Sequence, residues 1–386
     1  MAKTFASRIP IIIAVVALTL TMTFPLVLGQ QEDPIEPLAT SQPIITARDR
    51  VLNAQPLAMY YYYDDPRGLK SIQEHSSEMT LLAPQCYVVE PDGVIQGTLP
   101  PGIAEASASS PVALMPLVFN KGFDRSTVTR LLHSPKAQER AVSYMAYLAA
   151  RENTVGIQID LENIAPADMA RFTRFVRLAA ARLHRDGRLL SVAVVPRFAD
   201  GPPGRPRPGR PSSGEWSAAF DYRALGRAAD FLTIMAYDQS HRTGPAGPIA
   251  GYEWVRKILD YAVKRVDRKK LLLGLPLYGR EWTEASRNSA SRSLSALEVR
   301  ELLARPDVEV QWDDRWRSPW FQYREAGSLR TVWYEDSRSW SEKLRLVTEY
   351  RLRGFAAWRL GFEDAEFWPA AQFAPTGGTS TSTASQ

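Results

Sequence analysis

The most constraining feature of this sequence is a series of short apolar runs separated by stretches with helical periodicity. Eight runs have the length of buried strands: Ala58–Tyr63, Met79–Val89, Val112–Phe119, Val155–Leu161, Leu189–Val195, Phe231–Tyr237, Leu271–Leu277 and Gly354–Trp358. Helical patterns lie between most of them: Arg125–Ala150, Pro166–Arg185, Tyr222–Arg227, Glu253–Val266 and Trp340–Arg353. Alternating strands and helices predict a parallel sheet, and eight units in about 320 residues fit a (β/α)8 TIM barrel. A doubly wound open sheet is the alternative, although no Gly-rich phosphate loop follows the first run.

This alternation breaks within residues 283–332. Ser295–Ala304 has the pattern of a short helix, and three further runs alternate like small antiparallel strands: Val308–Trp312, Trp320–Arg324 and Arg330–Tyr334. We therefore expect a small α+β insertion between the seventh and eighth strands of the barrel.

The N-terminal end of the sequence has the pattern of a targeting segment. Lys3 and Arg8 precede an uncharged apolar run over residues 9–29. Residues 1–29 are expected to be a cleaved signal peptide or, because the run is long enough to span a bilayer, a membrane anchor. Either alternative predicts a protein that is secreted or held in the cell envelope or periplasm.

Three further stretches are set apart by their composition. Residues 30–54 are polar and contain proline, which predicts a linker. Residues 371–386 have the low complexity of a disordered tail. Asp200–Gly214 is crowded with Pro, Gly and Arg, which is typical of a long surface loop. The barrel domain is therefore expected over residues 55–370.

Charge and cysteine content narrow the classes of partner. The net charge of +5 indicates either a solvated basic surface or attraction to an anionic polymer or envelope. Nucleic-acid binding is not expected, because no helix-turn-helix, zinc or RNA-binding signature is present. The single cysteine, Cys86, cannot form a disulfide within the chain. The four histidines lack metal-ligand spacing, so neither a metal nor a cofactor is expected. No feature indicates an oligomeric state.

The fourth predicted strand carries two carboxylates on one face. Because side chains alternate along a strand, its two faces are Ile157, Ile159 and Leu161 on one side and Gln158, Asp160 and Glu162 on the other. In a barrel the polar set points inward, at the C-terminal end where barrel enzymes place their sites. Like charges this close raise one pKa, and a carboxyl that stays protonated can act as a general acid. The alternative is an exposed edge strand, which the surrounding apolar strands disfavour.

Four motifs follow one another in a fixed order. They are Val155–Glu162 on the fourth strand, Met235-Ala-Tyr-Asp238 on the sixth, Leu275-Pro-Leu-Tyr-Gly-Arg280 on the seventh and Gly354-Phe-Ala-Ala-Trp358 on the eighth. Together they resemble glycoside hydrolase family 18, the chitinase-like family. Asn120-Lys-Gly-Phe-Asp124 and Trp358-Arg-Leu-Gly-Phe-Glu-Asp364 make the chain more similar to a bacterial branch that includes spore-cortex peptidoglycan hydrolases. The resemblance spans Pro56–Pro369.

The resemblance implies a mechanism in which the substrate supplies the nucleophile. Glu162 would protonate the glycosidic oxygen, while Asp160 would orient the substrate's own acetamido group for attack on the anomeric carbon. Tyr237 would hydrogen-bond the acetamido oxygen, and Trp358 would form the floor under the distorted sugar. Further contacts with substrate are implied for Gln158, Met235, Asp238, Tyr278 and Arg280.

Three positions depart from the family pattern. Val155 and Gln158 stand where the fourth-strand motif has aspartates, and Met115-Pro-Leu-Val118 replaces the usual third-strand motif. Gln158 cannot share charge or a proton with Asp160, although its amide can still form a hydrogen bond to that carboxylate.

Tryptophan is concentrated near the C-terminal end, because eight of the ten lie between Trp282 and Trp368. Most are expected to form the core of the insertion. Trp316 and Trp320 are the better candidates for contact with a sugar.

The sequence thus predicts a glycosidase that acts on β-linked N-acetylglucosamine polymers, with peptidoglycan ahead of chitin and an acidic pH optimum. A non-catalytic glycan-binding protein of the same fold is the second hypothesis, since fold alone does not determine function. A membrane-anchored structural protein is the third. The presence of Glu162 favours the enzyme.

Overall fold

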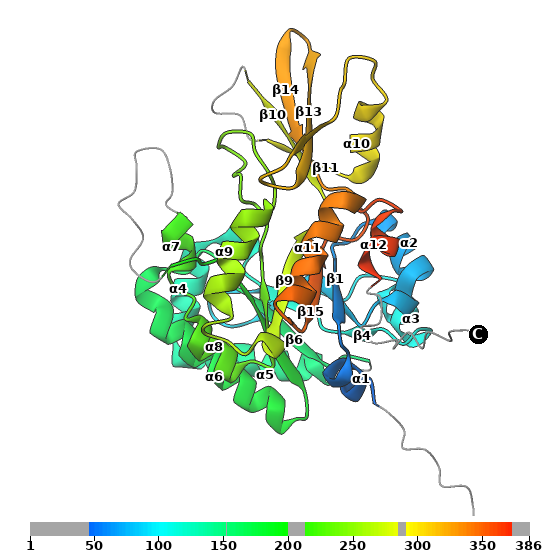
Figure 1. The fold of residues 1–386 in the computed structure, drawn as a ribbon. Coiled ribbons are helices and arrows are strands. Elements are labelled where there is room, and N and C mark those ends of the chain that lie inside the picture. Colours follow the sequence, from blue (N-terminus) through cyan, green and yellow to red (C-terminus); the bar gives the residue numbers. More distant parts are fainter. Residues whose placement is uncertain (1–45, 152, 200–212, 285–290, 373–386) are drawn as a thin grey trace, which may run out of the picture. The chain divides into compact units, whose positions relative to one another are not determined.

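Eight parallel strands close into a barrel in this computed structural model, which describes residues 46–151, 153–199, 213–284 and 291–372 (Figure 1). In order around the barrel they are β1 (Leu57–Tyr62), β2 (Leu81–Val89), β5 (Leu117–Phe119), β6 (Gly156–Asp160), β7 (Leu189–Val194), β8 (Phe231–Ile234), β9 (Leu271–Pro276) and β15 (Gly354–Trp358). The barrel closes because β1 pairs with both β2 and β15. The predicted (β/α)8 fold is confirmed.

Helices cover the outside of this barrel. They are α2 (Pro66–His75), α3 (Ile103–Ala108), α4 (Arg125–His133), α5 (Pro135–Ala149), α6 (Met169–Arg185), α7 (Ser213–Ser217), α8 (Tyr222–Ala228), α9 (Tyr252–Ala262), α11 (Ser337–Glu349) and α12 (Phe367–Ala371). Ile157 and Ile159 of β6 share one apolar cluster with Phe172 and Val176 of α6. The apolar face of β6 therefore packs against the helices. Among the described residues, none of the helices is both long and apolar enough to cross a membrane.

Two predicted elements are each divided at a proline. The strand expected over Val112–Phe119 is interrupted at Pro116 between β4 (Ala113–Leu114) and β5. The helix expected over Arg125–Ala150 ends at His133, and α5 begins afresh at Pro135. Proline has no N–H to donate and its ring blocks the preceding turn, so it can begin a helix but not continue one.

The α+β insertion lies between β9 and β15, as predicted. Its antiparallel sheet has the order β11 (Arg292–Leu294), β10 (Gly279–Thr283), β14 (Ser328–Trp333), β13 (Ser318–Glu325) and β12 (Gln311–Asp313). Helix α10 (Ala296–Leu303) accompanies it (Figure 1). The insertion sheet begins four residues earlier than the sequence predicted, at Gly279 rather than residue 283. A Cβ at Gly279 would lie 2.9 Å from the Cβ of Tyr334, so this close approach between strands requires glycine.

Residues 47–53, expected to belong to a linker, instead form helix α1 (Ala47–Asn53). The Thr46 side chain accepts a hydrogen bond from Asp49 N at 3.1 Å and caps the helix. Val51 packs in the same apolar cluster as Leu57 and Phe231, which face the barrel interior. The segment expected at residues 1–29, nearly all of the Asp200–Gly214 loop and residues 373–386 of the expected tail lie outside the described residues.

Candidate active site

The polar face of β6 points into the barrel. Gln158 is fully buried, and its Nε2 donates to Ser191 Oγ of β7 at 2.9 Å and to Thr233 Oγ1 of β8 at 3.1 Å. Side chains alternate along a strand, so Asp160, the last residue of β6, also faces inward, with 5% exposure. The hydrogen bond that the Gln158 amide could form to Asp160 is not made, because neighbouring hydroxyl groups accept from that amide instead.

Burial dominates the electrostatics of the two acids. It raises the pKa of Asp160 above the usual range, and no described group donates a hydrogen bond to Asp160 Oδ1. Burial also raises the pKa of Glu162, and the nearby charges of Asp160 and Asp238 raise it further. A carboxyl that remains protonated towards neutral pH is suited to general acid catalysis.

Asn120 fixes the backbone on which Glu162 stands. Its fully buried side chain accepts from Glu162 N at 3.0 Å and donates to Glu162 O at 3.2 Å. The next residue, Asn163, has a left-handed backbone with φ of 55°, and its side-chain oxygen accepts from Arg125 Nη2 at 2.9 Å. Residues that follow β5 therefore fix the conformation of the turn after β6. The sequence placed Asn120 in a motif but assigned it no role.

Trp216 of α7 contacts the same acid, and sequence reasoning missed it. Its Nε1 donates to Glu162 Oε2 at 3.0 Å, an interaction that lowers the pKa of Glu162 and opposes the effect of burial. The available signal was a single tryptophan directly after the Asp200–Gly214 stretch, well away from the C-terminal concentration of tryptophans.

The motif after β8 leaves the strand earlier than predicted. β8 ends at Ile234, and the following backbone makes two tight turns, with Ala236 N donating to Ile234 O at 2.7 Å and Tyr237 N to Met235 O at 2.8 Å. Strand alternation therefore does not orient these side chains. Met235 is buried in the larger apolar core. Tyr237 is partly buried, and burial, with Asp160 among the nearby charges, raises its pKa well above the usual range.

Asp238 is bound by two residues of the seventh-strand motif. Tyr278 donates its hydroxyl to Asp238 Oδ1, and Arg280 Nη2 lies 2.7 Å from the same oxygen. Arg280 Nη1 also donates to Ser240 O at 2.9 Å, and the Arg280 side chain is only 4% exposed. The guanidinium predicted to contact neighbouring sugars is thus engaged by protein groups, because Arg280 stands on β10 of the insertion sheet.

Trp358 lies at the C-terminal end of β15. Its ring centroid is 5.2 Å from that of Tyr61, whose pKa is raised by burial and by the charges of Asp160 and Glu162. An aromatic cluster joins this region to the insertion: Tyr237, Tyr278, Trp282, Trp316, Trp320, Trp333 and Trp358. The structure therefore brings together most of the residues that the sequence singled out.

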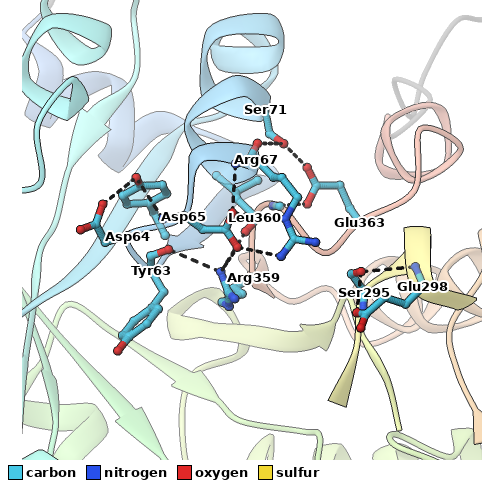
Figure 2. Close-up of polar contacts among 12 residues, drawn as sticks. Tyr63, Asp64, Asp65, Arg67, Ser71, Ser295, Glu298, Arg359, Leu360 and Glu363 are labelled. Atoms are coloured by element: carbon cyan, nitrogen blue, oxygen red, sulfur yellow. Dashed lines mark hydrogen bonds and ion pairs between the residues drawn. The ribbon is translucent and has the colours of Figure 1, made fainter. Parts of the chain in front are cut away.

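The segment after Trp358 is tied to helix α2 and to the N-terminal cap of that helix (Figure 2). The Arg359 guanidinium lies 3.2 Å from Asp65 Oδ2. Ser71 of α2 donates to the Glu363 carboxylate. These contacts fix the chain on one side of Trp358. Among the described residues there is no group of three or more His, Cys, Asp or Glu side chains that could hold a metal ion.

Comparison with known proteins identifies related chains. The profile of the family described as "Glycosyl hydrolases family 18" matches residues 120–363. YdhD of Bacillus subtilis is 29% identical over 280 residues, which cover 71% of this chain and 64% of that relative, less than two thirds of its length. The cortical fragment-lytic enzyme of Bacillus subtilis is 26% identical over 319 residues, covering 79% of this chain and 72% of that one. A chitinase structure from Chromobacterium violaceum has a TM-score of 0.73 at 29% identity, covering 82% and 98% of the two chains.

Proposed function

The chain belongs to family 18 of the glycosyl hydrolases and is a glycosidase, and from this premise we propose that it cleaves β-linked N-acetylglucosamine-containing polymers, with peptidoglycan ahead of chitin. The observation that carries the proposal is the pair of inward acids, Asp160 and Glu162, at the C-terminal end of β6. Burial raises the pKa of both. A catalytic use accounts for two carboxyls that would otherwise only cost stability.

Glu162 acts as the general acid in this mechanism. Its proton passes to the glycosidic oxygen as the bond from that oxygen to the anomeric carbon breaks, and the electron pair of that bond leaves with the departing sugar. The oxygen of the substrate's acetamido group forms the new bond to the anomeric carbon, and water later opens the cyclic intermediate. Glu162, now ionised, accepts a proton from that water.

The remaining residues position the substrate. Asp160 orients the acetamido N–H and balances the positive charge that develops on the group. Tyr237 donates its hydroxyl to the acetamido oxygen, and burial supports this role because its raised pKa keeps that hydroxyl protonated. Trp358 provides an apolar surface for the sugar ring. Asp238 and Tyr278 contact the substrate close to Tyr237.

Three observations support a cell-wall glycan as the substrate. One relative is a cortical fragment-lytic enzyme, and the chitinase likeness supports N-acetylglucosamine in the cleaved polymer. The net charge of +5 favours association with an anionic envelope. The apolar run over residues 9–29 supports action outside the cytoplasm, in the secreted form or at the envelope.

An assay of new reducing ends tests the proposal. Purified protein is incubated with chitooligosaccharides and, separately, with peptidoglycan, and compared with Glu162→Gln, which keeps the side-chain shape but cannot donate the proton. We expect wild-type cleavage, faster on peptidoglycan, and a loss of about 100-fold or more in the variant. Glu253→Gln, an exposed glutamate on α9, is the matched control and should retain full activity.

Equal rates for the wild type and Glu162→Gln would remove Glu162 from the mechanism. Binding of either glycan without cleavage by the wild type would instead support the non-catalytic glycan-binding hypothesis.

A further inference from the structure

The proposed acid, Glu162, is hydrogen-bonded to Trp216, whose indole group can donate a hydrogen bond but cannot accept one. Indole Nε1–H is a donor only, and it lies 3.0 Å from one of the two carboxyl oxygens, Oε2. We propose that Trp216 is a positioning residue that places the catalytic proton of Glu162 on Oε1. This proposal rests on the proposed role of Glu162 as general acid.

Trp216 is held by its own segment of chain. Ser217, Ala219 and Phe220 just after it are buried, and Phe220 packs edge-on against Phe172 of α6, with ring centroids 5.5 Å apart. Arg197, which follows β7, donates to Phe220 O at 2.9 Å. On the other side, the Trp216 ring lies edge-on to Phe123 at 6.2 Å. The segment that follows Trp216 is thus anchored by α6 and the end of β7, and the indole itself contacts the segment after β5.

The chemistry of a carboxyl group then selects the protonated oxygen. A protonated carboxyl has one O–H oxygen and one carbonyl oxygen, and only the carbonyl oxygen can accept well from a donor. Because Oε2 already accepts from Trp216, the O–H belongs to Oε1. This is the oxygen that delivers the proton to the glycosidic oxygen, so the indole sets the direction of transfer.

The same contact strengthens as the reaction proceeds. When the proton leaves Oε1, the carboxyl becomes an anion, and hydrogen bonds to charged acceptors are roughly twice as strong as those to neutral ones. Trp216 therefore stabilises the product of proton transfer more than the reactant. An interaction that is stronger after transfer lowers the barrier to it.

The charges around Glu162 show why such a donor matters. Burial disfavours the ionised form of Glu162, and so do the charges of Asp160 of β6 and Asp238 after β8. The nearby Tyr61 and Tyr237 have raised pKa values and remain neutral. The bond from Trp216 acts in the opposite direction.

An NMR titration tests the contact without using activity. The indole ¹H–¹⁵N signal of Trp216 is assigned by its loss in Trp216→Phe and followed from pH 4 to pH 10. We expect it to shift with a midpoint at least one unit above about 4.3, the ordinary pKa of glutamate, and to stay constant in Glu162→Gln. A wild-type signal that does not titrate, or one that titrates equally in Glu162→Gln, overturns the proposal. The comparison of the wild type with Glu162→Gln leaves the Trp216 side chain itself unchanged.

Kinetics of Trp216→Phe test the consequence. This variant keeps an aromatic ring but loses the donor, so kcat should fall by about 10- to 100-fold with little change in KM. The alkaline limb of the kcat/KM profile should move to higher pH, because the lost bond favoured ionised Glu162. Trp254→Phe, a partly buried tryptophan on α9, should change neither. If the alkaline limb of the kcat/KM profile does not move in Trp216→Phe, the proposal is overturned. If the wild type is inactive but its Trp216 indole signal titrates, only the proposed function is refuted.

Discussion

Arg280 is the buried partner of the half-exposed Asp238, with 2.7 Å between Nη2 and Oδ1. The same guanidinium donates to Ser240 O at 2.9 Å and lies over the ring of Tyr278, 5.5 Å from its centroid. A single planar group on the insertion sheet therefore fixes the loop after β8, which carries Tyr237. This arrangement makes Arg280 a determinant of the shape of the site.

Arg280→Lys should lower kcat/KM by about tenfold and the free energy of unfolding by about 1–3 kcal/mol. One ammonium cannot reproduce the planar fork that reaches both Asp238 and Ser240, and a buried charged group that loses one of its hydrogen-bond partners costs about that much. Steady-state kinetics and chemical denaturation measure the two effects. Arg315→Lys, in an exposed ion pair with Glu253, is the control and should change neither. Equal behaviour of both variants would contradict this account.

Asp160 and Glu162 should destabilise the fold at neutral pH. Their pKa values are raised in the folded state, so between about pH 4 and the raised values the folded chain holds protons that the unfolded chain has lost. In this pH range the free energy of unfolding falls as pH rises. Asp160→Asn and Glu162→Gln remove the effect and should each be more stable than the wild type by about 1–3 kcal/mol at pH 7, with the advantage vanishing near pH 4.

Thermal or urea unfolding across this pH range measures the difference. Glu309→Gln, at an exposed glutamate of the insertion, is the control. A constant difference between Glu162→Gln and the wild type at every pH would show that the Glu162 pKa is not raised on folding.

The barrel and the direction of the β6 acids could be predicted because both depend on periodicity within one segment. Once Gly156–Asp160 is recognised as a strand, alternation alone puts Gln158 and Asp160 on one face. The same rule failed beyond Ile234, where the sequence continues to alternate but the backbone turns away from the sheet. Alternation cannot report where a strand ends, since that depends on the hydrogen bonds available from its neighbours.

The contacts of Trp216 and Arg280 could not be predicted for a different reason. Trp216 and Glu162 are 54 positions apart in the sequence, and their contact depends on how the segment after α7 packs against α6. Arg280 lies on an insertion strand rather than the barrel strand that its motif indicated. Neither partner leaves a local pattern in the sequence, because each contact is set by tertiary packing.

Gly274 of β9 should tolerate no side chain. A Cβ there would lie 2.4 Å from Ile234 O and 3.0 Å from Cε1 of Tyr237. Gly274→Ala must therefore shift either the β8 backbone or the proposed catalytic tyrosine, and should cost about 1–3 kcal/mol of stability together with most of the activity. Gly244→Ala is the control, since its nearest neighbour would be His241 O at 3.5 Å. Full activity of Gly274→Ala would mean that the position of the Tyr237 ring is not critical.

Gln158 occupies a motif position where an acid would change the charge of the site, so Gln158→Glu tests why the amide is there. The Gln158 Nε2 donates to both Ser191 Oγ and Thr233 Oγ1. A protonated glutamate has one O–H donor in place of two N–H donors, and an ionised one would be buried close to Asp160. Gln158→Glu should therefore destabilise the fold by about 1–3 kcal/mol at pH 7 and by less at pH 5.

Unfolding at the two pH values measures this difference in stability, with Gln322→Glu, at an exposed position of β13, as the control. If Gln158→Glu were as stable as the wild type at pH 7, the barrel interior would accept a third carboxyl without cost, and the amide would not be needed to limit its charge.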